Sequence, residues 1–178
     1  MTMNTIKNHI VVSILEQTLL LFQESKLYKR YPIATAKNGI GQQEGSECTP
    51  LGKHRIVEKI GSDAPVDAVF VGRQWQGELY TENLAREHPD RDWILTRILW
   101  LDGLEQGLNR GFLYEKQINQ QAISCDTKSR YIYIHGCPDS HAMQIPSSHG
   151  CIKMRNNDIL ELFDIVSVNT EVFIQAEN

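Results

Sequence analysis

Hydrophobic and polar positions alternate in short blocks from the start of the chain. Two runs rich in Val, Ile and Leu cover Ile10–Leu15 and Thr18–Phe22, and the polar pair Glu16 and Gln17 separates them. Short apolar runs divided by two polar residues are typical of a β-hairpin. We therefore expect the chain to open with this hairpin and to continue as a third strand over Leu27–Ala36.

The block pattern resumes after a polar interruption. Residues Lys37–Pro50 concentrate Gly, Gln, Glu and Ser, a composition that indicates an exposed loop. Further loops are expected over Asp102–Gly111 and Gly136–Ser148. Further strands are expected over Lys53–Ile60, Ile94–Leu101, Arg130–Ile134 and Glu171–Gln175. The Ile94–Leu101 run is almost entirely apolar, so we expect it to be buried.

Two segments have helical signals. Thr81 can cap a short helix over Glu82–Glu87, which Pro89 would end. Asn157–Val166 places its apolar residues on one helical face, with Asn156 or Asn157 as the expected N-cap. The sum is a mainly β, mostly antiparallel domain with one or two short helices, and the alternative is a generic α+β sandwich.

Length and composition fit one folded domain. The chain has 178 residues, of which 22% are charged and 41% hydrophobic, and we expect a single domain over residues 1–178. The formal net charge is -4 and no run of basic residues forms a stripe, so we expect no nucleic-acid partner.

The N-terminal region and the cysteines bear on location. The apolar run Ile10–Leu15 is cut by Glu16, and we identify neither a signal peptide nor a stretch of about 18 to 20 apolar residues that would cross a bilayer. The four cysteines form no closely spaced pairs, which favours reduced thiols. We expect a soluble, cytoplasmic protein without disulfides and without a membrane partner.

Candidate chemistry is concentrated between His135 and Cys151. This window holds three of the six histidines and two of the four cysteines. A histidine can take the proton of a cysteine thiol and lower its pKa, so Cys151 is the candidate nucleophile. Gly150 lets the backbone approach a substrate carbonyl, and the amides of Gly150 and Cys151 are candidate donors of an oxyanion hole.

The cysteines and histidines also allow structural and metal-binding interpretations. Cys48, Cys125 and Cys137 are expected to be small buried hydrophobes. A zinc site from Cys137, His141, His149 and Cys151 is disfavoured because the usual ligand spacings do not occur, and we expect no metal and no cofactor. The remaining histidines are expected at the surface or in loops; they are His9, His54 and His88.

Two separated motifs resemble one known family. Ser148-His149-Gly150-Cys151-Ile152 follows the strand-terminal pair His135-Gly136, and 12 residues (136–147) separate His135 from Ser148. Upstream lies Thr49-Pro50-Leu51-Gly52. Both resemble the signatures of the L,D-transpeptidase (YkuD-type) family over about Asn8 to Gln175, which implies a β-sandwich-like catalytic domain.

The resemblance also implies roles for individual residues. Cys151 would form a thioester and His135 would be the general base, with His149 as the alternative base; the carbonyl of Gly136 would hold the second ring nitrogen of His135. His149 and Gly150 would position substrate or the oxyanion, and Ser148 would hydrogen-bond within the site.

The chain departs from the family pattern beyond the nucleophile. Lys153 stands where the family usually has arginine, and an arginine appears instead at Arg155. Arginine grips a carboxylate with two hydrogen bonds and lysine acts as a point charge. Either residue is therefore a candidate for binding the substrate's carboxylate.

The implied substrate is a peptidoglycan stem peptide or muropeptide, attacked at the carbonyl of an L-configured diamino acid with release of the following D-residue. Because we expect the protein in the cytoplasm, water is the expected acyl acceptor, as in an L,D-carboxypeptidase of bacterial cell-wall recycling. The alternatives are an L,D-transpeptidase that forms cross-links and a catalytically idle muropeptide sensor. A carbapenem is the expected covalent inhibitor. The role of Gly61–Asp92, a flap or ordinary surface, stays open.

Overall fold

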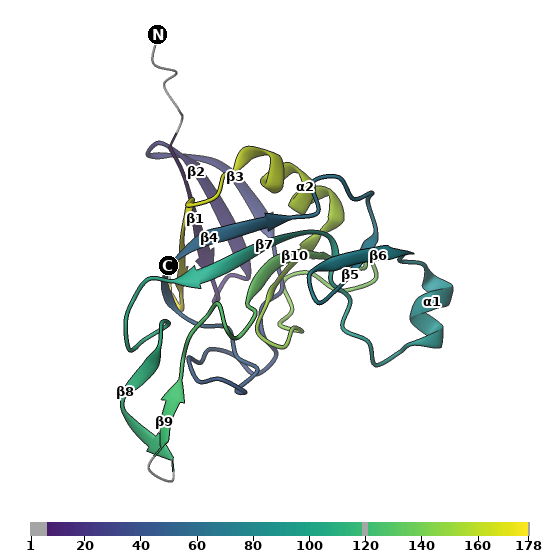
Figure 1. Cartoon of the computed structure of the whole chain (residues 1–178). Coiled ribbons are helices and arrows are strands. Elements are labelled where there is room, and N and C mark those ends of the chain that lie inside the picture. The colour runs from purple at the N-terminus through teal and green to yellow at the C-terminus, as the bar shows by residue number, and fades with distance from the viewer. Residues whose placement is uncertain (1–6, 119–120, 178) are drawn as a thin grey trace.

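The computed structural model describes residues 7–118 and 121–177, and it confirms a mainly β chain with two short helices in these residues (Figure 1). The first strands are β1 (Asn8–Ser13), β2 (Thr18–Gln23), β3 (Lys26–Pro32), β4 (Gly52–Ile60), β5 (Ala68–Val71) and β6 (Gln74–Leu79). Helix α1 (Glu82–Glu87), β7 (Leu95–Gly103), β8 (Phe112–Ile118) and β9 (Gln121–Ser124) follow. The chain continues with β10 (Tyr133–Cys137), β11 (Ile152–Arg155), α2 (Asn156–Ile165) and β12 (Glu171–Gln175).

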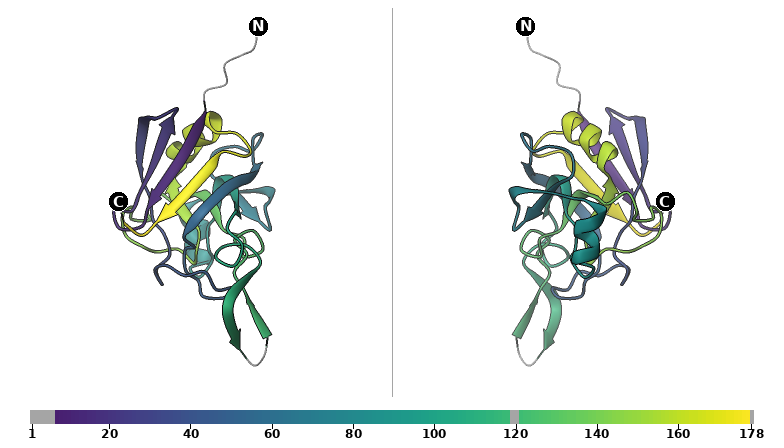
Figure 2. Two further views of the ribbon diagram at one scale, coloured as in Figure 1. Left: turned by 90° about the vertical axis from the view of Figure 1, so that its left-hand side faces the viewer. Right: turned by 90° about the vertical axis from the view of Figure 1, so that its right-hand side faces the viewer.

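Most strands form one strongly curled sheet, seen from two sides in Figure 2. Its order is β11-β10-β7-β4-β12-β1-β2-β3, with parallel pairing of β1 to β12 and of β10 to β11 and antiparallel pairing along the rest of this path. Just after β3, Ala34 exchanges two backbone hydrogen bonds with Lys153 of β11, at 2.9 and 3.0 Å. The two ends of the sheet path therefore meet at β11.

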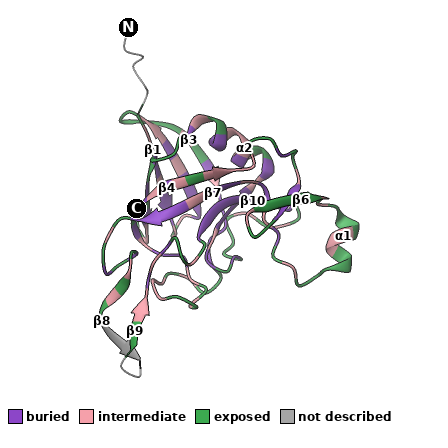
Figure 3. Cartoon of the chain, in the orientation of Figure 1, coloured by how far each residue is buried: buried purple, intermediate pink, exposed green. Residues whose placement is uncertain are grey.

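The two faces of β10 and β11 have different surroundings. Ile134, Ile152 and Met154 point into the main core, which also contains the apolar face of α2. Tyr133 belongs to a smaller apolar cluster on the opposite face, where it packs with Ile98 and the base of the β5–β6 hairpin. β10 is buried along its whole length (Figure 3), so its polar residues lie in a dry environment.

The structure confirms the opening hairpin and corrects several boundaries. The third strand ends at Pro32, four residues early. The strand expected over Arg130–Ile134 is displaced, because residues 126–131 form hydrogen-bonded turns and Tyr131 has a φ of 57°. β10 accordingly runs from Tyr133 to Cys137, and the loop predicted from Gly136 begins only after Cys137.

The helices were predicted at the right places, but one cap was wrong. Thr81 caps α1 by accepting a hydrogen bond from Leu84 N–H at 3.1 Å, as expected. The N-cap of α2 is Arg155, without a side-chain cap hydrogen bond. Asn156 instead lies in the first turn, where its Oδ1 accepts from Thr96 and its Nδ2 donates to Asp67 at 2.8 Å. These bonds take the side chain away from the helix end.

Five strands were not predicted: β5, β6, β8, β9 and β11. β5, β6 and α1 belong to the 61–94 segment (residues 61–94); in Figure 1 the β5–β6 hairpin lies beside β7 and β10, and α1 projects away from the sheet. Val69 of β5 pairs with Leu95 of β7, and Phe70 packs in the cluster of Tyr133. The segment therefore covers the outer face of the sheet next to β10. Within the described part of the chain, no helix has the length and apolar character needed to span a membrane.

Candidate active site

Cys151 lies just before β11, beside β10. Its Sγ accepts a hydrogen bond from Tyr133 N–H at 3.4 Å and donates toward the carbonyl oxygen of Tyr131 at 3.5 Å. The side chain also packs against the apolar cluster of Tyr133. Backbone groups of the strand start thus hold the thiol in a defined position while part of the residue stays accessible.

The acidity of this thiol differs from the expectation. We expected a neighbouring histidine to lower the pKa of Cys151, and this was wrong: burial raises it to about 12. The Tyr133 amide and the charges of Lys153 and Arg130 act in the opposite direction, but desolvation is the larger effect. Cys151 is therefore a neutral thiol at pH 7 and needs a base to become a nucleophile.

His135 lies in the middle of β10 and is completely buried. Its Nδ1 is 2.8 Å from the carbonyl oxygen of Gly136, the contact that the family resemblance implied. Its Nε2 is buried and has no hydrogen-bond partner among the described residues. Burial lowers the pKa of His135 below its usual value, with the carboxylate of Asp92 acting against this, so the ring is neutral at pH 7.

The strand register brings the two side chains to one face. His135 stands opposite Lys153 in the parallel pair of β10 and β11, and Cys151 precedes Lys153 by two residues. Since side chains two apart on a strand point to the same face, His135 and Cys151 are diagonal neighbours on the face away from the main core.

The turn that carries Cys151 is fixed by hydroxyl groups. Ser148 Oγ donates to the carbonyl of Cys151 at 2.5 Å and accepts from Gly150 N–H at 3.2 Å. Thr49 Oγ1 donates to the carbonyl of Gly150 at 3.0 Å, so the two motifs found in the sequence meet in space. Gly150 has a φ of 129°, and a Cβ there would lie 2.9 Å from Ile132, which explains the glycine.

One of these contacts occupies an amide that we expected in the oxyanion hole. Gly150 N–H already donates to Ser148 Oγ, so in this arrangement it is engaged within the turn. The amide of Cys151 is then the donor of choice from that pair for an oxyanion beside Sγ.

The basic residues on either side of Cys151 contact other groups of the protein. Lys153 is buried; its Nζ donates to the carbonyl of Ser147 at 3.2 Å and lies 3.8 Å from Asp92. The Arg155 guanidinium donates to the carbonyl of Asp139. His149 is exposed, and its Nδ1 lies 3.6 Å from Asp92.

Asp92 is a site residue that the sequence did not single out. It comes from the 61–94 segment, and its carboxylate reaches Lys153 and His149 and acts on the pKa of both His135 and Cys151. The Gly61–Asp92 segment therefore contributes to the site, because its end borders the site. Asp92 belongs to no motif, so only its three-dimensional position identifies it.

The metal alternative finds no geometric support. In residues 7–118 and 121–177, no three or more His, Cys, Asp or Glu side chains are grouped to hold a metal ion. Cys137 is buried, with its Sγ directed to the carbonyl of Met154. His54, expected at the surface, is instead completely buried in β4, hydrogen-bonded to Gly52 and Thr127.

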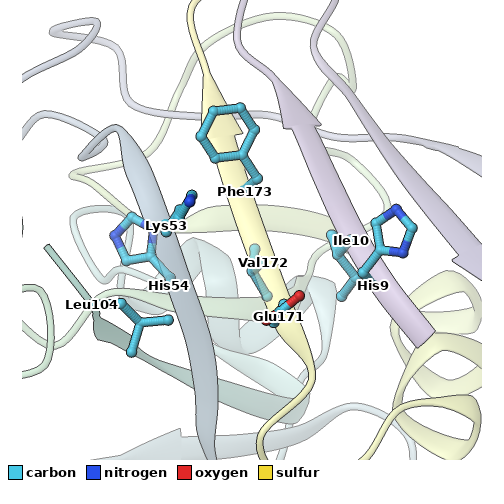
Figure 4. Close-up of a pocket in the computed structure, with 8 residues that line it drawn as sticks. All are labelled: His9, Ile10, Lys53, His54, Leu104, Glu171, Val172 and Phe173. Carbon is cyan, nitrogen blue, oxygen red and sulfur yellow. The ribbon is translucent and has the colours of Figure 1, made fainter. Parts of the chain in front are cut away.

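A separate hollow of about 170 Å³ lies on the outer surface of β1, β12 and β4 (Figure 4). It is lined by His9, Ile10, Lys53, His54, Leu104, Glu171, Val172 and Phe173. It shares no lining residue with the surroundings of Cys151, and we assign the chemistry to the Cys151 site.

Comparison with known proteins identifies the family of the chain. A model of the YkuD L,D-transpeptidase catalytic domain matches residues 7–174, and the chain belongs to that family. A search among curated proteins gives no significant match.

Solved structures of L,D-transpeptidases share the fold. L,D-transpeptidase 3 from Mycobacterium tuberculosis, with a faropenem-derived adduct, has a TM-score of 0.57 and 15% identity over 96% of this chain and 60% of its own. The Mycobacterium smegmatis enzyme has a TM-score of 0.54 and 14% identity over 96% and 59%. LdtMt1 in complex with imipenem has a TM-score of 0.53 and 15% identity over 96% and 59%. The chain therefore spans about three-fifths of the length of these structures.

Proposed function

We propose that this chain is a cysteine acyl-transfer enzyme acting on peptidoglycan stem peptides. Cys151 attacks the carbonyl of the L-configured centre of a diamino acid, and the following D-residue leaves. Family membership supports this reaction class, since the related structures are named as L,D-transpeptidases.

The proposal rests on the hydrogen bonding of the two ring nitrogens of His135. Its Nδ1 is occupied by the Gly136 carbonyl, which fixes the proton on Nδ1 and leaves the lone pair on Nε2. That buried nitrogen has no partner among the described residues. A buried acceptor without a donor is costly in a structural role, and it is what a base needs before it takes a proton.

The chemistry proceeds in two proton transfers. The Cys151 thiol turns from the Tyr131 carbonyl toward His135, gives its proton to Nε2, and Sγ bonds to the substrate carbonyl carbon. The carbonyl oxygen becomes an oxyanion, for which the Cys151 amide is the proposed donor. The imidazolium then passes the proton to the leaving nitrogen, the C–N bond breaks and a thioester remains.

For the second half of the reaction we propose water as the acceptor, as in an L,D-carboxypeptidase. Water needs no dedicated binding site, whereas an amine acceptor competes only if the protein holds it in near-attack geometry. After the first half, His135 Nε2 is again free of its proton and can take one from water. The names of the structural neighbours favour the alternative of cross-linking by an amine.

Product analysis tests the proposal. With a tetrapeptide stem ending in D-alanine, free or linked to its disaccharide, mass spectrometry should find the tripeptide and D-alanine as main products. A cross-linked dimer as main product would favour the transpeptidase, and binding without turnover would favour an idle sensor. The cytoplasmic location stays a prediction that cell fractionation tests.

Covalent inhibition provides a test at the nucleophile. We expect imipenem to acylate Cys151 alone, since Cys125 and Cys137 are buried and the Cys48 thiol is held by carbonyls of its own loop; the structure of LdtMt1 in complex with imipenem supports the choice of probe. Peptide mapping of the adduct checks this. Cys151→Ala should abolish the adduct and Cys48→Ser should keep it, because the Cys48 thiol donates to carbonyls of its own loop. Label spread over Cys48, Cys125 and Cys137 would contradict the assignment.

A further inference from the structure

The substrate of the proposed reaction ends in a carboxylate, and the two residues expected to bind it are engaged elsewhere. Lys153 is buried, and its Nζ contacts the Ser147 carbonyl and Asp92. The Arg155 guanidinium is bound to the Asp139 carbonyl. A third basic residue lies near the site, and no sequence motif indicated it. This residue is Arg73, in the turn between β5 and β6.

Aromatic rings hold Arg73 in one place. Its guanidinium carbon lies 4.6 Å from the ring centre of Trp100 and 4.9 Å from that of Tyr131. One guanidinium N–H donates to the Tyr133 hydroxyl at 3.2 Å. Two cation–π contacts and a hydrogen bond restrict a side chain that otherwise loses much rotamer freedom on binding.

The backbone of Arg73 is also unusual. Gly72 and Arg73 both have positive φ, 56° and 66°, which is the pattern of a type I′ hairpin turn. The second position of such a turn favours glycine, and a long side chain there carries a cost in backbone conformation. The unfavourable backbone conformation therefore occurs at the residue whose side chain reaches Tyr133.

The same two tyrosines flank the nucleophile. Tyr133 N–H donates to Sγ of Cys151, and the Tyr131 carbonyl accepts from it. The Tyr133 side chain, which carries the hydroxyl bound by Arg73, packs in the apolar cluster that Cys151 also contacts. Tyr133 thus connects Arg73 with Cys151, because its hydroxyl contacts the guanidinium and its amide contacts Sγ.

Arg73 forms no ion pair among the described residues; the hydrogen bond to Tyr133 is the largest effect that raises its pKa, and the charge of Glu58 adds a smaller one. No carboxylate of the described residues lies within 4.0 Å of its guanidinium, although six other lysine and arginine side chains have such a partner: Lys7, Lys29, Arg30, Arg55, Arg91 and Lys153. A guanidinium has five N–H donors, and Tyr133 uses one. Donors therefore remain for a planar anion.

We propose that Arg73 binds the carboxylate of the D-residue that leaves when Cys151 attacks, and so selects stems with a free carboxyl end. The inference rests on the proposed function. The carboxylate lies one residue beyond the scissile carbonyl, and Tyr133 connects Arg73 with Sγ. A fixed guanidinium can bind a carboxylate through two parallel hydrogen bonds, which adds orientation to charge.

The first experiment compares two substrates, a tetrapeptide stem ending in D-alanine and the same stem ending in D-alaninamide. The wild type should prefer the acid by about tenfold to a hundredfold in kcat/KM. Arg73→Gln should lose this preference through a higher KM for the acid while its rate on the amide is kept, and Arg73→Lys should recover part of it. An unchanged preference, or equal losses on both substrates, would overturn the proposal.

The second experiment does not need the peptide. Iodoacetate and iodoacetamide alkylate the same thiol but differ in charge, and the ratio of their rates at Cys151 should fall about tenfold in Arg73→Gln. Lys128→Gln is the matched control, because Lys128 also lies over the Trp100 ring, at 5.5 Å, and should leave the ratio unchanged. An unaltered ratio in Arg73→Gln, or the same fall in both variants, would overturn the assignment.

Together the two experiments separate the inference from the proposed function. If the wild type releases no D-residue from either stem but the alkylation ratio falls only in Arg73→Gln, the function fails and the carboxylate site stands. Urea unfolding of each variant checks that the fold is kept. If Arg73→Gln does not fold, Arg73→Lys decides, since it keeps the charge and should still lower the acid preference severalfold; full preference in Arg73→Lys would then contradict bidentate binding.

Discussion

Burial changes the acidity of the two reacting side chains in opposite directions. It raises the pKa of Cys151 to about 12 and lowers that of His135, so both groups are neutral in the resting protein. The cysteine–histidine spacing in the sequence suggests an ion pair, because sequence shows neighbours and not desolvation. In the reaction that we propose, proton transfer and attack by Cys151 therefore occur together.

Asp92 provides a test of this resting state. Acylation needs neutral His135, so kcat/KM should rise with pH through the pKa of His135, which lies below 6.5. The Asp92 carboxylate raises that pKa, so in Asp92→Asn it falls further and the acid limb of the profile should move to lower pH. The measurement is the pH dependence of kcat/KM, or of imipenem acylation.

Lys153 provides a second variant for the same measurement, with the opposite expected shift. Its charge lowers the pKa of His135, so Lys153→Met should move the acid limb to higher pH, opposite to Asp92→Asn. Shifts of both variants in one direction would show that the profile reports another group.

Elements with long apolar runs were predicted well, whereas short or partly polar strands were missed, including the local hairpins β5–β6 and β8–β9. The hairpin β1–β2 and the apolar strand β7 follow directly from their runs of Val, Ile and Leu. β11 has four residues and was missed, because its partners, β10 and Ala34, lie far away in the sequence. Resemblance to a family singled out Cys151 and His135 as candidates, but it could not identify the residues that border them.

The turn before β11 depends on the hydroxyl group of Thr49. Thr49 is completely buried; its Oγ1 donates to the Gly150 carbonyl and accepts from Ala36 N–H, both at 3.0 Å. Thr49→Val keeps the shape but leaves both backbone groups unpaired, so the free energy of unfolding should fall by about 1–3 kcal/mol. Because the turn positions Cys151, the acylation rate should fall about tenfold in the protein that remains folded.

Thr49→Ser is the control for that prediction. It keeps the hydroxyl and removes one methyl group, so most of the acylation rate should return. Urea unfolding and imipenem acylation, measured on both variants, check the result. Equal acylation rates in Thr49→Val and the wild type would show that the hydrogen bond to Gly150 does not position the nucleophile.

At the scale of the whole molecule, the site is assembled from distant parts of the chain. The turn at Thr49, the 61–94 segment, β10 and the start of β11 meet on one face of the curled sheet. The sheet curls far enough for Ala34 to pair with Lys153, and this closure fixes β11 on both edges. Arg73 and Asp92 join the site only through this arrangement, which is why no local pattern identified them.

The same closed sheet buries His54, which predicts how stability depends on pH. Burial lowers the pKa of His54 to about 4, against 6.5 for the free side chain, so the unfolded chain binds the extra proton first. Its contribution is complete above pH 6.5 and is lost as pH falls toward 4, reaching a loss of about 2 kcal/mol at pH 5. In guanidinium unfolding at pH 7.5 and 5, His54→Gln should show a drop smaller by that amount, and the exposed control His88→Gln should match the wild type. The same drop in His54→Gln as in the wild type would mean that His54 does not titrate in this way.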